Sequence, residues 1–346
     1  MIARLQNLPR PLRLVAWLVF LGGGVLILII ITLMLVNNSP RNEGTSLLDY
    51  VTVEEYATLP DDNAYPATLT IASDGTLYTG SYVTGTVWRI PPAENGLGGE
   101  AIEIPSTRSN IGSVVGLYLR DDGKLLVLDR IDYEPGQGGG ILWEVDNGGA
   151  VVLFAQFPDV ADVSVNDITG DDAGNLYITD RSGDVIWRIE SGSHEPQVWW
   201  TAPYVEGDKE AEISALAYDA TNQALLVTDV GRDIIYRVPL SAAEPQSATD
   251  ILYKYSGVDS EAPGLEGIDV AADGRIFVAA LGVNKVYELV NGELSYIAEN
   301  FRGVSDVVIG PDGRLYVTNW NQFSLLVGAL TPRLPFGLDV ITINAN

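Results

Sequence analysis

The sequence predicts an all-β protein, a six-bladed β-propeller preceded by a single transmembrane helix. Three observations predict this fold. A short phrase recurs six times, a large core residue follows most copies at a fixed distance, and 23 consecutive residues near the N-terminus carry no charge. The anchors, meaning the first core residue of each copy, are Leu77, Leu125, Leu176, Leu225, Ile276 and Leu315.

Each copy of the phrase is a turn followed by an apolar run, as in DGTLYTG from Asp74, AGNLYITD from Ala173 and DGRLYVTN from Asp312. Successive anchors are separated by 48, 51, 49, 51 and 39 residues. Repeats of this length, each made of several short strands, are typical of a β-propeller in which every repeat forms one blade. Six copies therefore predict six blades.

Each repeat contains the signals of four strands. A short run ends in a tight turn before the anchor, and a Gly/Asp turn then leads to a second large core residue eleven positions after it, which predicts a hairpin. Runs such as 151–154, 198–200 and 294–297 predict a fourth strand. The second core residues are Trp88, Trp187, Tyr236, Tyr287 and Leu326, with Trp143 in the second repeat after seven extra residues.

Two further features concern how the strands connect. The anchor strand ends in an acidic or amide residue in four repeats, and we expect these residues to hold the hairpin turn. The last spacing is short, so the sixth blade needs a strand from an end of the chain. Residues 48–56 and 338–343 are both strand-like, and the sequence does not decide between them. The four strand-ending residues are Asp129, Asp180, Asp229 and Asn319.

An uncharged apolar segment precedes the repeats. Residues 14–36 suffice for the roughly 20 residues that a helix needs to cross a bilayer. Arg4, Arg10 and Arg13 precede this segment without any acid, so the positive-inside rule places the N-terminus in the cytoplasm. A cleaved signal peptide is the alternative, although its apolar region is usually about 7–15 residues. We expect a cytoplasmic N-terminus (1–13), a transmembrane helix (14–36) in the plasma membrane, a linker (37–46) and an extracytoplasmic propeller (47–346).

The composition excludes several classes of function. The chain has 46 acidic and 20 basic residues and a net charge of −26, which argues against nucleic acid and anionic membrane surfaces as partners. It has no cysteine, hence no disulfide, thiol nucleophile or cysteine-ligated metal. Its single histidine, His194, falls in a loop expected at the periphery, so no Ser-His-Asp triad is predicted at the channel.

The candidate site lies where the innermost strand of each repeat begins, because these strands line the channel of a propeller. Four residues there, Asn166, Asp167, Glu266 and Asp306, carry oxygen ligands that suit calcium, a hard cation. The alternative is that Asn166 and Asp167 cap strand ends through backbone amides and that Glu266 is a solvated residue at the channel mouth. Aligning the repeats gives two channel columns: Ala67, Val115, Asn166, Ser214, Glu266 and Ser305, and beside them Thr68, Gly116, Asp167, Ala215, Gly267 and Asp306.

The third repeat resembles a known family. Its pattern Val-Asn-Asp-Ile-x-x-Asp-x-x-Gly-Asn-Leu-Tyr-Ile-Thr-Asp, from Val165 to Asp180, is similar to the third-blade motif of the SMP-30/gluconolactonase/LRE-like propellers. The repeat phrase also resembles NHL repeats, and the resemblance covers about residues 60–330. It implies hydrolysis of a lactone or ester around one divalent cation. That cation is held by a first-blade Glu, a fourth-blade Asn and a fifth-blade Asp, with a third-blade Asn nearby.

The resemblance retains only part of that metal site in this sequence. The third-blade Asn falls on Asn166 and the fifth-blade Asp on Glu266, so both keep ligand chemistry. The fourth-blade Asn falls on Ser214, a weaker ligand, and the first-blade Glu falls near Ala67, where there is no carboxylate. Asp167 is a further candidate ligand. Loss of a charged ligand is expected to lower the affinity for a cation sharply.

Two functions from different classes are consistent with the sequence. The first is a non-catalytic, membrane-anchored propeller that binds a protein, peptide or glycan partner outside the cell, or serves as the outer subunit of a membrane complex. The second is a lactonase or esterase that depends on calcium or another divalent cation. In that enzyme the metal acts as Lewis acid on a small lactone or ester, and Glu266 is the base for water.

Overall fold

The computed structural model describes residues 23–27, 44–131, 138–158, 163–204, 206–207, 209–327 and 332–344. The chain divides into two compact units, Asn42–Trp320 with Pro335–Asn346, and Met1–Arg41 with Asn321–Leu334. In the second of these, residues 23–27 are helical and α4 spans Gln322–Leu326. All the strands belong to the first, which we call the propeller unit.

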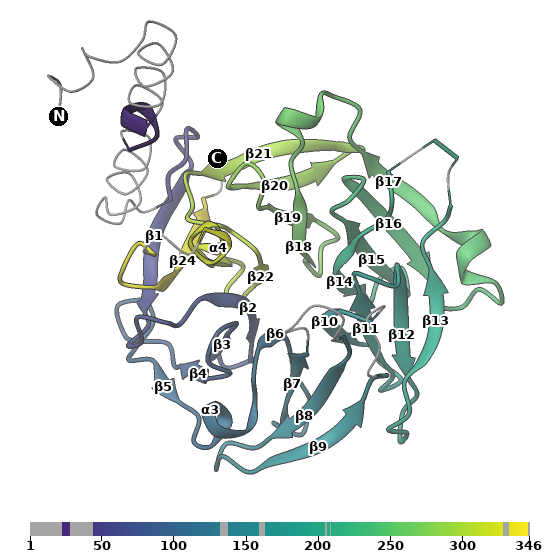
Figure 1. Ribbon diagram of the computed structural model, residues 1–346, viewed down its shortest axis with the longest axis horizontal. Coiled ribbons are helices and arrows are strands. Elements are labelled where there is room, and N and C mark those ends of the chain that lie inside the picture. Colours follow the sequence, from purple (N-terminus) through teal and green to yellow (C-terminus); the bar gives the residue numbers. More distant parts are fainter. Residues whose placement is uncertain are drawn as a thin grey trace, which may run out of the picture. The chain divides into compact units, whose positions relative to one another are not determined.

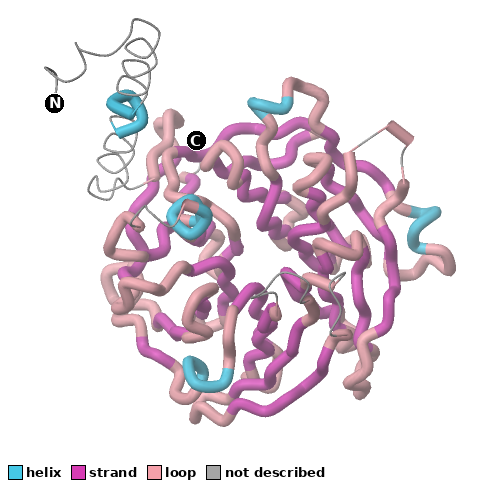
Figure 2. Tube along the Cα trace, in the orientation of Figure 1, coloured by secondary structure: helices cyan, strands magenta, loops and turns pink. Residues whose placement is uncertain are grey.

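The propeller unit consists of six four-stranded antiparallel sheets, the blades, set around a common axis (Figure 1; Figure 2). The predicted six-bladed β-propeller is confirmed. Blade 1 contains β2 (Pro66–Ile71), β3 (Leu77–Ser81), β4 (Val87–Ile90) and β5 (Ile102–Glu103). Blade 2 contains β6 (Val114–Leu119), β7 (Leu125–Arg130), β8 (Gly140–Val145) and β9 (Val151–Gln156). Blade 3 contains β10 (Val165–Gly170), β11 (Leu176–Asp180), β12 (Val185–Ile189) and β13 (Gln197–Thr201).

The remaining blades follow the same order from the axis outward. Blade 4 contains β14 (Ile213–Asp219), β15 (Ala224–Asp229), β16 (Ile234–Pro239) and β17 (Asp250–Lys254). Blade 5 contains β18 (Leu265–Val270), β19 (Ile276–Ala280), β20 (Lys285–Val290) and β21 (Glu293–Glu299). Blade 6 contains β22 (Val307–Ile309), β23 (Leu315–Thr318), β24 (Gly337–Ile343) and β1 (Val51–Thr58). The connecting loops include the short helical turns α3 (Thr107–Asn110), η1 (Pro245–Ala248) and η2 (Asp259–Glu261).

The recurring phrase forms the tight turn and second strand of each blade. In blade 2, Asp122 Oδ1 accepts a hydrogen bond of 3.2 Å from the Lys124 amide. Gly123, between them, has φ of 81°, a left-handed conformation that favours glycine. The anchor Leu125 then begins β7 with its side chain 2 % exposed. Local turn chemistry and core burial thus explain why this phrase recurs once per blade.

Two of the strand-ending residues, Asp180 and Asp229, hold the hairpin turn as predicted, and they also bind outside it. The side-chain oxygens of Asp129 and Asn319 accept from the segment that leads into the innermost strand. In blade 3, Asp180 Oδ1 accepts from the amides of Ser182 and Gly183, each at 3.1 Å. It also accepts from the Ser164 amide at 2.9 Å, in the segment that leads into the innermost strand. Oδ2 accepts from Trp187 Nε1 at 2.9 Å. One carboxylate therefore joins the turn, the entering chain and the second core residue of the repeat.

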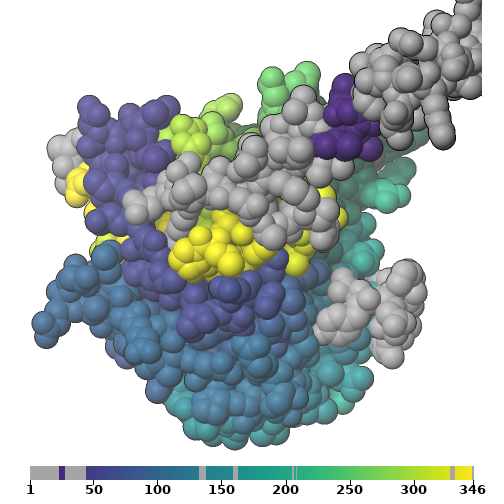
Figure 3. Space-filling view, turned by 60° about the vertical axis from the view of Figure 1, so that its left-hand side comes forward, coloured from purple at the N-terminus to yellow at the C-terminus, as the bar shows by residue number. Residues whose placement is uncertain are grey.

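Both ends of the chain contribute to the sixth blade. β24 pairs with β23 and β1 pairs with β24, from Val51 opposite Ile343 to Thr58 opposite Gly337. The purple of the first strand and the yellow of the last residues accordingly meet on one side of the molecule (Figure 3). The prediction that Leu326 supplies the third strand of this blade is wrong: it lies in α4 and is 72 % exposed. The chain instead returns after β23 with β24 as the third strand of the blade.

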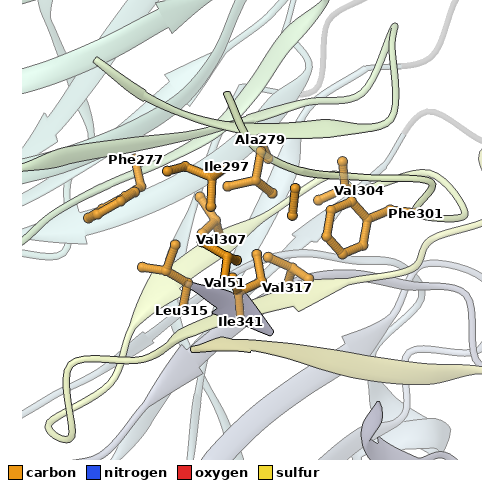
Figure 4. Packing of buried hydrophobic residues seen from close by; sticks show 12 residues of the cluster. Val51, Phe277, Ala279, Ile297, Phe301, Val304, Val307, Leu315, Val317 and Ile341 are labelled. Carbon is orange, nitrogen blue, oxygen red and sulfur yellow. The ribbon is translucent and has the colours of Figure 1, made fainter. Parts of the chain in front are cut away.

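The hydrophobic core lies between neighbouring blades. Between blades 5 and 6, Phe277 and Ile297 of blade 5 belong to one buried cluster with Val51, Val307 and Ile341 of blade 6 (Figure 4). This cluster therefore includes a strand from each end of the chain. Because stacked repeats bury their apolar faces only against their neighbours, closing the ring completes the core. β1 and β24, the first and last strands, therefore contribute to the stability of the ring.

The predicted transmembrane helix falls mainly on residues outside those described. Within the described part of the chain, no helix is long and apolar enough to cross a membrane. Residues 23–27, inside the predicted span, are helical. The expected cytoplasmic N-terminus (1–13) lies outside the described residues, as does most of the linker (37–46).

Candidate ligand site in the channel

The two channel columns gather around one small cavity of about 30 Å³, room for about one or two water molecules. Ten of their twelve residues line it, from all six blades. In blades 1 to 5 a register shift falls on the columns, as between Val165 and Ile168 of blade 3. Such bulges leave residues unpaired in their own sheet and re-aim them. The cavity is lined by Ala67, Thr68, Val115, Asn166, Asp167, Ala215, Glu266, Gly267, Ser305 and Asp306, together with Tyr82, Arg181 and Trp320.

Three of the predicted ligand residues form a chain of hydrogen bonds across blades 3, 4 and 5. Asn166 Nδ2 donates to the Ser214 carbonyl oxygen at 2.9 Å. The Ser214 hydroxyl donates in turn to Glu266 Oε2 in a short hydrogen bond. Glu266 is only 5 % exposed, so it is not the solvated mouth residue of the alternative interpretation. The structure therefore brings Asn166, Ser214 and Glu266 together.

Glu266 is paired with an arginine that the channel columns do not contain. Arg181 Nη1 lies 3.3 Å from Oε1 and 3.4 Å from Oε2 of Glu266. The other edge of the guanidinium binds Glu212, whose Oε1 lies 2.8 Å from Nε and also contacts Nη2. Burial lowers the pKa of Arg181, but the two carboxylates outweigh it and raise the pKa above its usual value. A permanent positive charge is thus fixed beside the predicted ligands.

Asp167 has a different environment from the other predicted ligands. Its Oδ2 accepts from the Leu216 amide of blade 4 at 3.0 Å, and its Oδ1 accepts from the Ile168 amide at 2.8 Å. Burial raises its pKa to about 7, against the opposing effect of these two amides. Asp167 therefore caps strand ends, as the alternative interpretation expects, and joins blade 3 to blade 4.

The same device recurs at two other junctions between blades. Asp306 Oδ2 accepts from the Leu69 amide at 2.9 Å, which joins blade 6 to blade 1. Asp269 Oδ2 accepts from the Ile309 amide at 2.7 Å, which joins blade 5 to blade 6. Asp269 lies outside the channel columns and was missed by the sequence analysis. The shared signal is an aspartate directly before a β-branched residue in the innermost strand, or just before it begins.

This arrangement does not suit a divalent cation. Among the residues that the structure describes, no three Asp, Glu or His side chains converge to hold a metal. The charge of Glu266 is already balanced by Arg181, and both oxygens of Asp167 accept from backbone amides. The carboxylate of this group, Glu266, is instead bound by the Arg181 guanidinium, which is a suitable partner for a carboxylate.

A third column surrounds the channel, and its signal was present in the sequence. Counting five residues after each anchor gives a position at the end of the second strand or one to two residues beyond it. In every blade the backbone N–H of this residue donates to the segment before the innermost strand. Three of its members line the cavity. Aromatic rings and guanidinium groups thus occupy adjacent blades. This mouth column is Tyr82, Arg130, Arg181, Val230, Leu281 and Trp320.

Neighbouring members of the mouth column contact each other. The Arg130 guanidinium lies 5.1 Å from the centre of the Tyr82 ring and forms a short hydrogen bond with the Tyr82 hydroxyl. The Tyr82 and Trp320 rings are 5.2 Å apart at an interplanar angle of 64°. Trp320 is 7 % exposed, and its indole N–H has no acceptor among the described residues. One side of the mouth is therefore aromatic and the other cationic.

His194 lies outside this cavity, as expected. It lines a separate cleft of about 670 Å³ with residues of blades 2 and 3, where its Nδ1 is 2.8 Å from the Phe154 carbonyl oxygen. Its ring packs against the Phe154 ring at 4.6 Å. The single histidine therefore lines a different cavity from the one that Glu266 and Arg181 line.

Comparison with solved structures supports the propeller fold. A gluconolactonase from Xanthomonas campestris has 14 % identity and a TM-score of 0.57 over 88 % of this chain and 98 % of its own. A calcium-binding regucalcin from Agrobacterium tumefaciens has 16 % identity and a TM-score of 0.57, covering 84 % and 96 %. Virginiamycin B lyase from Staphylococcus aureus has 17 % identity and a TM-score of 0.51, covering 78 % and 83 %.

These likenesses confirm the predicted similarity to gluconolactonase-type propellers at the level of the fold. No protein-family model and no curated protein sequence matches the chain. Because the identities are low, the similarity concerns the arrangement of the blades rather than the residues of the channel.

Proposed function

We propose that this protein is a membrane-anchored propeller that binds a ligand or partner on the extracytoplasmic side without a catalytic metal. The observation that carries the proposal is the pairing of Arg181 with Glu266. A metal-dependent hydrolase of this fold needs a free carboxylate beside a cation, and here a guanidinium already neutralises that carboxylate. The channel mouth therefore has the character of a binding site.

The location rests on the sequence of the N-terminus. Residues 14–36 are uncharged, and Arg4, Arg10 and Arg13 precede them, which favours one span with the propeller outside. Such a protein acts as a receptor for a soluble ligand or as the outer subunit of a membrane complex. Resistance to carbonate extraction, with the propeller open to protease added outside, tests this orientation. Recovery in the soluble fraction contradicts it.

The second candidate is a calcium-dependent lactonase or esterase with Glu266 as its base. The hydrogen-bonded group of Asn166, Ser214 and Glu266 favours it, together with the likeness in fold to a gluconolactonase. In this enzyme a cation has to displace Arg181 from Glu266, and Asp167 has to turn away from its amides. Both steps break contacts that the structure contains.

One experiment separates the two candidates. We would measure thermal unfolding of the detergent-solubilised protein in excess EDTA and in millimolar Ca²⁺, with hydrolysis of a simple lactone beside it. A cation present at 100 times its dissociation constant adds ~2.7 kcal/mol to the stability of the folded state. We expect no shift and no turnover. A clear shift that is lost in Asn166→Ala, with turnover lost in Glu266→Gln, establishes the second candidate instead.

A further inference from the structure

We propose that the channel mouth binds a small molecule that carries a carboxylate on a planar apolar body, and that Arg181 holds the carboxylate. The proposal rests on the proposed function, because it names the ligand class of the same site. Three features of the mouth support it: the arrangement of the Arg181 guanidinium, a buried donor without an acceptor, and an aromatic wall.

The Arg181 guanidinium presents a carboxylate-binding edge that is occupied by a single oxygen of a partly exposed side chain. Its Nε and Nη2 atoms both contact Glu212 Oε1. This is the edge with which arginine binds a carboxylate through two parallel hydrogen bonds. The Glu212 side chain is 45 % exposed, and ion pairs with exposed side chains contribute little net stability. A ligand carboxylate can therefore replace Glu212 on Arg181 at small cost, while Glu266 keeps the guanidinium in place from its other side.

Trp320 provides an independent sign of a ligand. Its side chain lines the same cavity as Arg181 and is 7 % exposed, yet its Nε1 has no hydrogen-bond acceptor within the described residues. A buried donor without an acceptor is destabilising, because it has lost its hydrogen bonds to water without replacing them. An oxygen atom of a ligand in this cavity removes that cost. Trp320 Nε1 thus lacks an acceptor, which a ligand carboxylate supplies.

The size and walls of the cavity define the rest of the ligand. About 30 Å³ admits a carboxylate-sized group and no more, so the body of the ligand stays at the mouth. There it meets the Tyr82 and Trp320 rings, which are 5.2 Å apart. Val230 and Leu281 hold the equivalent position in blades 4 and 5. A planar apolar body suits such walls, and pockets of this kind combine apolar walls with a few fixed polar groups.

The charge around the cavity is mixed. Its lining contains Arg181 and three acidic side chains, Glu266, Asp167 and Asp306; Glu266 is paired with Arg181, and both aspartates accept from backbone amides. The mouth column contains Arg130 and Arg181 in adjacent blades and no acidic residue. Both guanidinium groups are largely buried, where a charge interacts more strongly than in bulk water.

The test is a ligand-observed NMR titration of the full-length protein in detergent micelles with phenylacetate. Phenylacetamide and 2-phenylethylamine are matched neutral and cationic probes of the same shape. We expect phenylacetate to bind at least about 10-fold more tightly than either, since the amide keeps at most one hydrogen bond from Arg181 in place of two and the amine accepts none. Arg181→Gln should weaken phenylacetate binding by about 10-fold or more, and Trp320→Phe by a smaller factor.

Two further variants separate the proposed contacts from general damage. Glu212→Gln removes the carboxylate that competes for Arg181, so it should strengthen phenylacetate binding. Arg275→Gln removes an exposed arginine that pairs with Asp273 in a peripheral turn, and it should leave binding unchanged. If Arg181→Gln does not fold, Glu212→Gln and Trp320→Phe still decide the question.

Equal binding of the acid and the amide overturns the proposal, as does a loss of affinity in Glu212→Gln or no binding of phenylacetate at millimolar concentration. Tighter binding of the amine identifies a site for cations, so that the ligand class is wrong while the binding function stands. Stabilisation by Ca²⁺ together with lactone turnover is a different result, because it overturns the proposed function itself.

Discussion

Arg181 of blade 3 is paired with Glu266 of blade 5, with Nη1 placed 3.3 Å from Oε1 and 3.4 Å from Oε2. The two residues are 85 positions apart in the sequence, and the blade between them contributes Ser214 to the same group. The pair therefore joins blades that do not touch through their sheets. It also determines the chemistry of the channel, because the carboxylate that resembles a metal ligand is already neutralised.

The first prediction concerns this pair. Glu266→Gln should lower the free energy of unfolding by about 2 kcal/mol or more, because it leaves a largely buried guanidinium without one of its carboxylates. Urea unfolding of the variant and the parent protein measures the difference. Glu212→Gln is the matched control. Its side chain is 45 % exposed, so its loss should stay below about 1 kcal/mol. Equal losses in the two variants would show that burial does not strengthen the Glu266 pair.

The second prediction concerns pH and the junction of blades 5 and 6. Burial raises the pKa of Asp269 to about 6, despite the amides of Ile309 and Val270, and the unfolded chain keeps the ordinary value. Between about pH 4 and about pH 6 the folded state then binds more protons than the unfolded state. The contribution of Asp269 to stability is therefore fully present at low pH and is lost as the pH rises.

This pH dependence is measured by urea unfolding across that range in the parent protein and in Asp269→Asn. The stability of the parent relative to the variant should fall as the pH rises, by on the order of 2 kcal/mol in total. Asp273 provides the control, because the Arg275 amide lowers its pKa. Asp273→Asn should remove a small dependence of the opposite sign. A flat difference between parent and Asp269→Asn contradicts the assignment.

The third prediction concerns the closure of the ring. Ile341 of β24 is fully buried between β1 and β23, in the cluster that joins blades 5 and 6. Ile341→Ala should cost about 2–5 kcal/mol, as large-to-small changes in a well-packed core do. Val152 of β9 is 57 % exposed, so Val152→Ala should change stability by less than about 0.5 kcal/mol. Thermal unfolding of both variants is the measurement, and a small effect of Ile341→Ala would mean that the sixth blade is not needed for stability.

Most of the fold could be predicted from the sequence because the signals are local and repeat. The turn before Leu125 and the core position itself depend only on neighbouring residues. The sixth blade could not be completed in this way. Its third strand, β24, follows an insertion of irregular length, so counting from the anchor led to Leu326 in α4 instead. Pairing between strands from the two ends of a chain leaves no local signal, and two strand-like segments were equally good candidates.

The channel was located by the repeats, but its chemistry was not. Counting to equivalent positions placed Asn166 and Glu266 around one cavity, with Ser214 hydrogen-bonded to both. It could not show that Arg181 reaches Glu266, since a long side chain crosses blades in a way that no spacing encodes. It also did not show that Asp167 turns toward the Leu216 amide of the next blade. Both features depend on the three-dimensional path of side chains.

The last prediction uses a tight backbone approach of two blades at the channel. A Cβ added to Gly267 would lie 2.5 Å from the Asp306 Cα and 2.9 Å from the Ser305 carbonyl oxygen, and both are backbone atoms that cannot move aside alone. Gly267→Ala should therefore separate blades 5 and 6, break the 2.9 Å hydrogen bond from the Gly267 amide to Ser305, and cost roughly 1–3 kcal/mol.

Thermal unfolding of Gly267→Ala beside Gly148→Ala measures this cost. Gly148 lies in an exposed turn, and its added Cβ would meet only the Asp146 side chain at 3.2 Å. The control should unfold close to the parent protein. If Gly267→Ala keeps the parent stability and still binds phenylacetate, the blades at the channel adjust more freely than their contacts imply. In that case the cavity at the mouth also adapts its size to the ligand.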